Sequence, residues 1–363
     1  MPSSPASYQS LSAQVAARIA EEIRAGTWQE WLPGERALTD SLQVSRKTLR
    51  KALAQLQRDG TLVTTHGLGH RIAIAAPPAS ARRADTTIGL LTPESLENLR
   101  PYTALWVDEL RALLIEHGAR LNTFAGHRFF NTRPDKALAR LVQQNPQTGW
   151  VLAHTNEQIQ QWFSDRRVPC VIAGSCHHGL DLPSVDWDNF AICRHAAGAM
   201  LRLGHRRVAF LTKQSQRAGD LESEAGFVDG VRRSRAGAEP IILRHDGTAE
   251  SVNRVLARVF GAATPPTALL IANPVYYLSA ITFLAQRGLR VPQDVSLVSR
   301  NDDTFLTYVT PAPARYTGNA KTYAKRLLQP IQSILRGEPV THPVQRIEPT
   351  FVAGASLTAP KAS

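Results

Sequence analysis

One short stretch of this sequence, SRKTLRKALAQL, begins at Ser45 and places four cations and no acid within its first seven residues. In a helix, Arg46 and Arg50 share one face, where a guanidinium can bind O6 and N7 of guanine in the DNA major groove. Lys47 and Lys51 fall about 100° further round the helix, which suits contacts with phosphates. This spacing favours recognition of a nucleic acid.

The apolar residues of the same stretch, Leu49, Leu53 and Leu56, recur at helical spacing and predict a buried face. Ser45 is suited to cap the start of this helix, because its hydroxyl can accept a hydrogen bond from a free backbone N–H. Taken alone, a basic amphipathic helix is more often a solvated surface helix than a DNA reader. The elements around it therefore decide between the two interpretations.

The neighbouring segments predict two more helices and a hairpin. Val15, Ile19 and Ile23 recur at helical spacing and indicate a first helix, and a short second helix is expected over residues 35–42. Gly60 ends the third helix, and two β-rich runs then flank the glycine turn HGLG. Helix, turn, helix and hairpin in this order form a winged helix-turn-helix, whose third helix enters the major groove. Because the basic helix is accompanied by the second helix, the turn and the wing in the expected order, we favour DNA binding over a solvated surface helix.

The bulk composition narrows the class of partner and the compartment. The 363 residues carry a formal net charge of +12, which favours an anionic partner, either nucleic acid or an acidic membrane surface. No apolar run is long enough to span a bilayer, and the first residues, MPSSPASYQS, lack the pattern of a secretory signal. Three cysteines, an odd number, favour reduced thiols over a disulfide framework. We therefore expect a cytoplasmic protein with no membrane partner.

A change in composition divides the chain. The segment AAPPASARRAD, residues 75–85, is rich in proline and alanine and has no periodic apolar face, which is typical of a linker. We predict a winged helix-turn-helix domain over 1–75, a linker over 76–86, a two-lobed domain over 87–357 and a tail over 358–363.

The larger domain alternates strands and helices. Amphipathic helices separate eight apolar strands, which we expect at 87–91, 119–124, 149–153, 169–174, 207–211, 240–244, 268–272 and 295–299. Apolar strands separated by helices indicate an α/β fold with parallel sheets covered on both faces. The number of units exceeds one comfortable sheet, so we expect two lobes with a ligand between them, at the carboxyl ends of the strands.

The N-terminal segment LPGERALTDSLQVSRKTLRKALAQLQRDGTLVTTHGLGHRI, residues 32–72, resembles the winged-helix domain of the GntR (gluconate-repressor) family. The resemblance rests on the Leu-Pro-x-Glu-Arg entry, the Val-Ser-Arg turn and the glycine-containing wing after RDG. It implies that Glu35 is a structural residue at a helix start. It also implies DNA contacts from the two helices and the wing tip, through Arg36, Ser45, Arg46, Lys47, Thr48, Arg50, His66 and Gly67.

Residues 165–211 and 288–311 are similar to the effector domain of LacI/GalR-type regulators, which are related to periplasmic sugar-binding proteins. A GntR head on such a domain is similar to the arabinose-repressor subgroup, and the usual LacI-type head is absent. The resemblance implies a homodimer formed by the effector domain and a small-molecule ligand held between two lobes. It extends over about residues 87–355.

The pocket positions depart from the family pattern. Ser223 stands where the family commonly has an arginine, and Asn301 stands where a sugar-binding carboxylate usually lies. Arg300 replaces an aromatic residue. It could bind an anionic ligand or be a surface or salt-bridge residue, and we expect the two roles about equally. Aromatic residues near such a cleft are more often core residues, although one can stack on a ligand. The candidate effector-binding residues are Tyr102, Trp187, Ser223, Asn273, Arg300 and Asn301.

Other kinds of site have less support. Cys176, His177 and His178 lack a second pair at zinc spacing, so we interpret them as a loop and expect no metal site and no cofactor. His205 begins a strand without a serine or aspartate partner, which favours a structural role. The sequence contains no nucleophile elbow, P-loop or dinucleotide fingerprint in a suitable context, so we expect no enzyme.

Two hypotheses follow. The first is a DNA-binding transcriptional regulator, most simply a repressor, whose operator affinity is controlled by a small molecule such as a sugar or sugar derivative. The second is a DNA-binding dimer with a degenerate effector pocket that senses no sugar. A solute-binding protein for transport would carry an export signal and no basic head, and neither feature fits this sequence.

Overall fold

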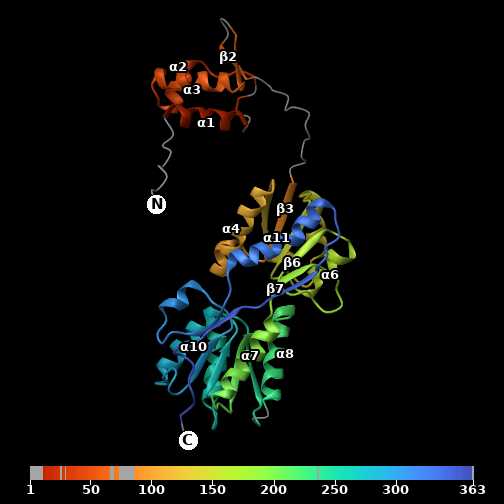
Figure 1. Ribbon diagram of the computed structural model, residues 1–363, viewed down its shortest axis with the longest axis vertical. Coiled ribbons are helices and arrows are strands. Elements are labelled where there is room, and N and C mark those ends of the chain that lie inside the picture. The colour runs from red at the N-terminus through yellow and green to blue at the C-terminus, as the bar shows by residue number, and fades with distance from the viewer. Residues whose placement is uncertain are drawn as a thin grey trace, which may run out of the picture. The chain divides into compact units, whose positions relative to one another are not determined.

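The structure is a computed structural model, and it describes residues 11–24, 27–28, 30–65, 69–72, 86–234 and 237–361. Contacts between Cα atoms divide the chain into two compact units, Met1–Ala84 and Asp85–Ser363. We call the first the head and the second the body, and Figure 1 shows the elements of each. Within the described ranges, no helix is both long and apolar enough to cross a membrane.

The described residues of the head form three helices and a two-stranded sheet. The helices are α1 (Leu11–Arg24), α2 (Glu35–Leu42) and α3 (Arg46–Arg58), and β1 (Leu62–Thr65) pairs antiparallel with β2 (Gly69–Ile72). Leu49, Leu53 and Leu56 on α3 are buried against the apolar face of α1, which includes Val15 and Ile19. The predicted apolar face of the third helix is confirmed, and burial of this face keeps the cations of α3 on the outside.

The described part of the body forms two six-stranded sheets, and each is the centre of a lobe. The sheet of the first lobe has the order β13-β7-β6-β5-β3-β4, and all of its pairings are parallel. Its strands are β3 (Thr86–Thr92), β4 (Ala119–Ala125), β5 (Gly149–Ala153), β6 (Cys170–Ala173), β7 (Ser184–Trp187) and β13 (Val344–Ile347). Its helices are α4 (Pro101–Glu116), α5 (Asp135–Gln144), α6 (Glu157–Asp165) and α11 (Ala320–Arg336), with the short 3-10 helices η1 (Leu96–Asn98) and η2 (His127–Phe129).

The sheet of the second lobe has the order β14-β12-β11-β10-β8-β9, and β14 alone runs antiparallel to its neighbour. Its strands are β8 (Val208–Lys213), β9 (Pro240–His245), β10 (Ala268–Ile271), β11 (Ser296–Ser299), β12 (Ala314–Thr317) and β14 (Thr350–Val352). Its helices are α7 (Asn189–Arg202), α8 (Ala218–Arg233), α9 (Ala249–Phe260) and α10 (Pro274–Gln286), with the 3-10 helix η3 (Thr304–Tyr308).

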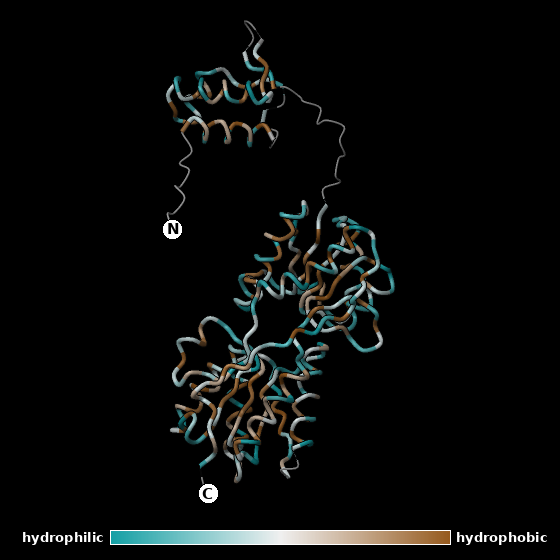
Figure 2. The backbone as a smooth tube through the Cα atoms, viewed as in Figure 1, coloured by the Kyte–Doolittle hydropathy of each residue, from teal (hydrophilic) through white to brown (hydrophobic). Residues whose placement is uncertain are grey.

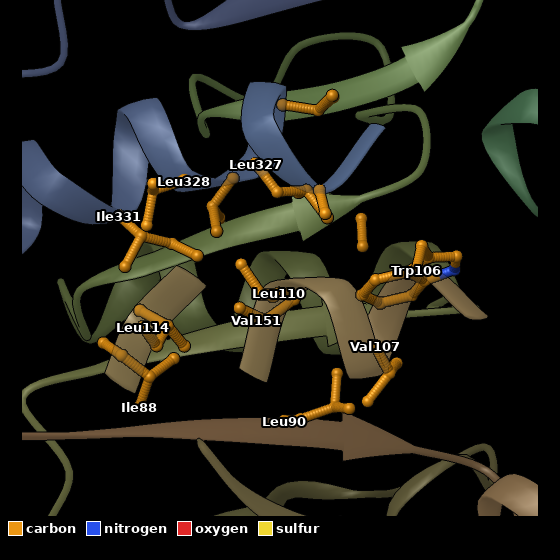
Figure 3. Packing of buried hydrophobic residues seen from close by; sticks show 14 of the residues in the cluster. Ile88, Leu90, Trp106, Val107, Leu110, Leu114, Val151, Leu327, Leu328 and Ile331 are labelled. Atoms are coloured by element: carbon orange, nitrogen blue, oxygen red, sulfur yellow. The ribbon is translucent and has the colours of Figure 1, made fainter. Parts of the chain in front are cut away.

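Apolar side chains cover both faces of each sheet. In the first lobe, α4 and α11 pack on one face, where Leu110, Leu327 and Ile331 meet Val151 of β5 (Figure 3). The hydropathy colouring in Figure 2 shows the most apolar segments along the central strands of both lobes. Burial on both faces is the environment that continuous apolar strands require. The predicted α/β fold with parallel sheets is therefore confirmed.

The chain passes between the lobes three times, from β7 to α7, from β12 to α11 and from β13 to β14. These crossing segments are packed together, because a Cβ atom on Gly318 would overlap the indole of Trp187. Three parallel crossings allow the lobes to open and close about a hinge while the sheets stay intact. Because both sheets are parallel, the carboxyl ends of their strands can face a shared cleft.

Candidate functional site

The first site is the exposed face of α3 in the head. Ser45 caps the helix, and its Oγ accepts a hydrogen bond from the backbone N–H of Thr48 over 3.2 Å. Arg46, Lys47 and Arg50 are exposed, whereas Thr48 is half-buried. The capped helix end also presents free backbone N–H groups and the positive end of the helix dipole, which favour a phosphate.

Arg50 differs from the other cations of this face because it already has a partner. Its Nε donates to Oε2 of Glu35 at the start of α2 over 2.9 Å. The Arg50 side chain is 69% exposed and that of Glu35 is 32% exposed, so this is a surface ion pair of modest strength. In the described part of the head, Arg46 and Lys47 have no such carboxylate partner. The Arg50–Glu35 pair links α2 to α3. Neither the residue spacing nor the family resemblance predicted it.

The remaining predicted DNA contacts are partly described. Arg36 lies exposed on the first turn of α2. The predicted wing-tip contacts His66 and Gly67 lie outside the described residues. The hairpin itself is tied to α3, because Gln57 Nε2 lies 3.1 Å from Nδ1 of His70 on β2.

The second site is a cleft of about 730 Å³ in the body, lined by residues of both lobes. Its volume lies within the ~300–1,000 Å³ that small-molecule sites commonly have. Its walls include residues at the carboxyl ends of parallel strands: His154 and Arg300 directly follow β5 and β11, and Asn273 lies two residues after the end of β10. This is the edge where open α/β sheets bind ligands.

Five of the six predicted effector residues line this cleft, namely Tyr102, Trp187, Asn273, Arg300 and Asn301. The two amides also serve the fold. Asn273 Oδ1 accepts from the backbone N–H of Val275 over 3.1 Å, and Asn301 Nδ2 donates to the carbonyl oxygen of Ala272 over 2.9 Å. Both side chains are therefore held in one orientation at the cleft wall.

Ser223 lies behind the cleft rather than on its wall. Its side chain is fully buried, and its Oγ donates to the carbonyl oxygen of Gly219 over 2.6 Å. Oγ of Ser223 also accepts a hydrogen bond from Nη1 of Arg300. We therefore correct the expectation that Ser223 touches a ligand: in this structure it holds the guanidinium of Arg300, which does line the cleft.

The aromatic residues belong to both the core and the cleft wall. Trp187 stacks on Tyr323, with ring centroids 5.8 Å apart, and Tyr102 lies 6.4 Å from each of them. Tyr323 is anchored by a hydrogen bond from its hydroxyl to the carbonyl oxygen of Val185 over 2.9 Å. This cluster, Tyr102, Trp187 and Tyr323, lines the cleft together with Trp106, whose ring centroid lies 5.5 Å from that of Tyr323.

Asp186 was not predicted and lies at the base of the cleft. Its Oδ2 accepts hydrogen bonds from Ser175 Oγ over 2.8 Å and from Asn189 Nδ2 over 2.9 Å. Burial raises the pKa of this carboxyl to about 6, and the hydrogen bonds from Ser175 and the backbone of Trp187 oppose that rise without cancelling it. Asp186 therefore changes charge just below neutral pH.

His154 and Arg217 connect the two lobes and were also not predicted. Nη1 of Arg217 donates to Nδ1 of His154 over 3.3 Å. Burial, together with the charges of Arg217 and Arg100, lowers the pKa of His154 to about 3, so the imidazole is neutral. The backbone of His154 is left-handed, with φ of 58°, a conformation that non-glycine residues adopt at a cost.

The loop at Cys176 has an ordinary structural role. Its Sγ donates to the carbonyl oxygen of Leu180 over 3.5 Å, and the backbone N–H of His177 donates to Gln160 Oε1 over 2.8 Å. Across the described ranges, no group of three or more His, Cys, Asp or Glu side chains is placed to hold a metal ion. His205 is buried and bonded to Thr267 Oγ1 and to the carbonyl oxygen of Thr358, each over 2.8 Å.

Family models match the head and the larger part of the body. Residues 11–72 match the model described as bacterial regulatory proteins of the gntR family, and residues 197–357 match the periplasmic binding protein-like domain. The chain joins a GntR-family head to a periplasmic-binding-protein-like body. It is a transcriptional regulator and not an enzyme.

Curated transcriptional repressors are similar to part of this chain or to most of it. The arabinose metabolism transcriptional repressor of Geobacillus stearothermophilus is 26% identical over 295 residues, covering 77% of this chain and 78% of that protein. The transcriptional repressor CytR of Escherichia coli K12 is 26% identical over 144 residues, covering 39% of this chain and 42% of that protein.

Solved structures share the fold. A LacI-type regulator from Bacillus cereus subsp. cytotoxis has a TM-score of 0.66 at 22% identity, covering 76% of this chain and 99% of that one. The regulator CelR in complex with cellobiose has a TM-score of 0.66 at 21% identity, covering 96% of this chain and 100% of that one. At these identities the likeness establishes the LacI-like architecture.

Proposed function

We propose that this regulator is a homodimeric repressor that binds operator DNA through α3 and is controlled by a small molecule in the body cleft. The observation that carries the proposal is one chain with two separate sites. A capped helix exposes Arg46 and Lys47 in a GntR-family head, and a cleft between two lobes collects polar side chains at strand ends. A DNA-binding regulator acts where the DNA is, so we place it in the cytoplasm.

The roles of the head residues follow from their positions. Arg46 and Arg50 share the outer face of α3 and would read base edges, while Arg36, Ser45, Lys47 and Thr48 would hold the phosphate backbone around them. His66 and Gly67 stay predictions for the wing tip. Two heads in a dimer would read two half-sites related by a twofold axis.

Control by the cleft requires that the ligand prefer one arrangement of the lobes. Three crossing segments join the lobes, so a ligand that contacts both would favour their closed arrangement. A change in lobe arrangement in each protomer would change the distance between the two heads, and hence operator affinity. The sugar-responsive relatives, an arabinose-metabolism repressor and a CelR–cellobiose complex, support a small polyhydroxylated effector.

Selection of DNA from a random duplex library tests the proposal. The full chain should enrich a sequence with twofold symmetry and bind it with two chains per duplex. Arg46→Ala should enrich a sequence that has lost its base preference at the positions read by Arg46. Enrichment of the same sequence by Arg46→Ala, or binding of one chain per duplex, would overturn the DNA-binding part of the proposal.

The alternative of a degenerate pocket is favoured by the amides of Asn273 and Asn301, which are already bonded to the backbone. Against it, the cleft retains buried donors without partners, which a merely structural interface would be expected to satisfy. A regulator of the degenerate kind would keep the same operator affinity whatever small molecule is added.

A further inference from the structure

The cleft contains an unusual concentration of guanidinium groups. Arg100 comes from the first lobe, just before α4, and Arg217 and Arg300 come from the second lobe, before α8 and after β11. Lys213, at the end of β8, adds a further cation on the exposed side. The three arginines therefore line one cleft from both lobes.

Two of these arginines carry donors that nothing satisfies. The side chains of Arg300 and Arg100 are 11% and 23% exposed, and the Nε atom of each is buried without a hydrogen-bond partner. Asp303 Oδ2 forms a long ion pair with Arg100 Nε over 4.0 Å, which is too far for a hydrogen bond. A buried charged donor without a partner is costly, and such groups are usually satisfied by a ligand, ion or water.

The carboxylates nearby balance these charges incompletely. Asp302 is committed to Arg315 over 2.8 Å, and Arg300 Nη1 lies 3.6 Å from Asp220. In the described part of the body, neither Arg217 nor Lys213 has a carboxylate within ion-pair distance. Arg100 and Arg300 also oppose each other electrostatically, since burial and then the charge of Arg300 lower the pKa of Arg100. An anion placed between them would reverse that repulsion.

The rest of the wall suits the non-ionic part of such a ligand. The carboxyls of Asp186 and Asp220 and the fixed amides of Asn273 and Asn301 can bond hydroxyl groups. Tyr102 adds an aromatic surface, and the guanidinium of Arg100 already lies 5.9 Å from its ring centroid. The cleft therefore combines an anion-binding part with a part that binds hydroxyls and an apolar ring face.

We infer that the effector is an acidic polyhydroxylated compound, a sugar acid or sugar phosphate, whose anionic group is held between Arg100 and Arg300 across the cleft. Guanidinium groups bind carboxylates and phosphates through paired hydrogen bonds, and both sources of charge fit this chemistry. The inference rests on the proposed control by a small molecule in the cleft. The inference adds that the anionic group of the effector contacts an arginine from each lobe and so favours lobe closure.

Matched pairs of compounds test this inference on the full chain. Glucose is compared with gluconate, glucuronate and glucose 6-phosphate, and ribose with ribose 5-phosphate, by thermal shift followed by calorimetry. At least one acid should bind, and its parent sugar should bind at least about tenfold more weakly. Carboxylate and phosphate acids are separate arms, so the experiment also shows which anion is preferred.

Variants assign the effect to the arginines. Arg100→Gln and Arg300→Gln should each weaken binding of the acid about 10–100-fold. Arg254→Gln, on the exposed surface of α9 and paired with Glu250, is the matched control and should leave affinity unchanged. If a cleft variant folds poorly, wild-type protein gives an independent readout, because added salt should weaken binding of the acid and not of a neutral sugar.

The outcomes separate this inference from the proposed function. A neutral sugar that binds more tightly than its acids and releases operator DNA would overturn the inference and leave the proposed function standing. Acids that bind wild type and both glutamine variants equally would also overturn it. The inference is also overturned if neither the carboxylate acids nor the phosphate acids bind more tightly than their parent sugars.

Discussion

Arg217 and His154 join the two lobes of the body through one hydrogen bond, from Nη1 of Arg217 to Nδ1 of His154, over 3.3 Å. Each residue lies where a strand leads into a helix, His154 after β5 and Arg217 before α8. Because His154 must accept this bond, its remaining proton is on Nε2 and the ring is neutral. One of the polar contacts between the lobes in this structure therefore requires a histidine that stays uncharged.

Replacing the donor should loosen this arrangement. Arg217→Met leaves Nδ1 of His154 without its partner, and we expect the free energy of unfolding of the body to fall by ~1–2 kcal/mol. Chemical denaturation followed by tryptophan fluorescence measures it. Arg254→Met, on exposed α9, is the control and should change stability by less than ~0.5 kcal/mol. Equal stability of Arg217→Met and the control would show that the bond contributes nothing.

Asp186 should make body stability depend on pH. Its pKa is about 6 in the folded chain and 3.8 ordinarily, so between these values the folded state binds the proton and the unfolded state does not. Its contribution to the free energy of unfolding therefore falls as pH rises through this window, by at most about 3 kcal/mol.

The difference in the free energy of unfolding between wild type and Asp186→Asn isolates the contribution of Asp186. Every other titrating group, including His154, is common to both proteins. We expect wild type to lose stability relative to Asp186→Asn between pH 4 and pH 7, measured by urea denaturation at intervals across that range. A difference that stays flat would mean that Asp186 titrates at its ordinary pKa.

The leucines of α3 should hold the head together without affecting the body. Leu53 is buried at the centre of the head core, so Leu53→Ala should cost ~2–5 kcal/mol. Calorimetry should show the melting transition of the head move down while that of the body stays in place. Lys51→Ala, on the exposed face of the same helix, should leave both transitions unchanged. A parallel shift of both transitions would show that the two units unfold together.

The Glu35–Arg50 pair should restrain binding to DNA of any sequence. Glu35→Gln removes a negative charge beside α3 and frees Arg50, so affinity for a random duplex should rise several-fold. Stability should change by less than ~1 kcal/mol, since the pair is exposed. Fluorescence anisotropy at several salt concentrations measures the affinity. Weaker binding by Glu35→Gln would show instead that Glu35 positions Arg50 for DNA.

Much of the fold follows from local sequence pattern. Each of the eight apolar runs expected to form strands does so, and 149–153 coincides with β5. The strands that sequence reasoning left out are β7, β12, β13 and β14. Along β13 exposed and half-buried residues alternate, so it lacks the apolar run that marked the others. These strands depend on chain segments that cross between lobes, which no local window contains.

The residues of the body cleft could be predicted from the sequence where they follow the ends of predicted strands. Arg300 and Asn273 follow predicted strands and line the cleft, and His154 follows β5 in the same way, so the same rule could have found it. Ser223 shows the limit, because the rotation of α8 turns it away from the cleft and toward Arg300. Arg100 lies before a helix, and its role depends on packing against the other lobe.

The most direct test of the account is the affinity of the head for its selected operator. Fluorescence anisotropy is measured with wild type and Arg46→Ala, on the selected duplex and on a scrambled duplex of the same composition. We predict that Arg46→Ala loses about 10–100-fold on the selected duplex, from ~1–3 kcal/mol of base recognition, and far less on the scrambled one. Equal affinity of the two proteins for the selected duplex would contradict the assignment of α3 as the DNA-reading helix.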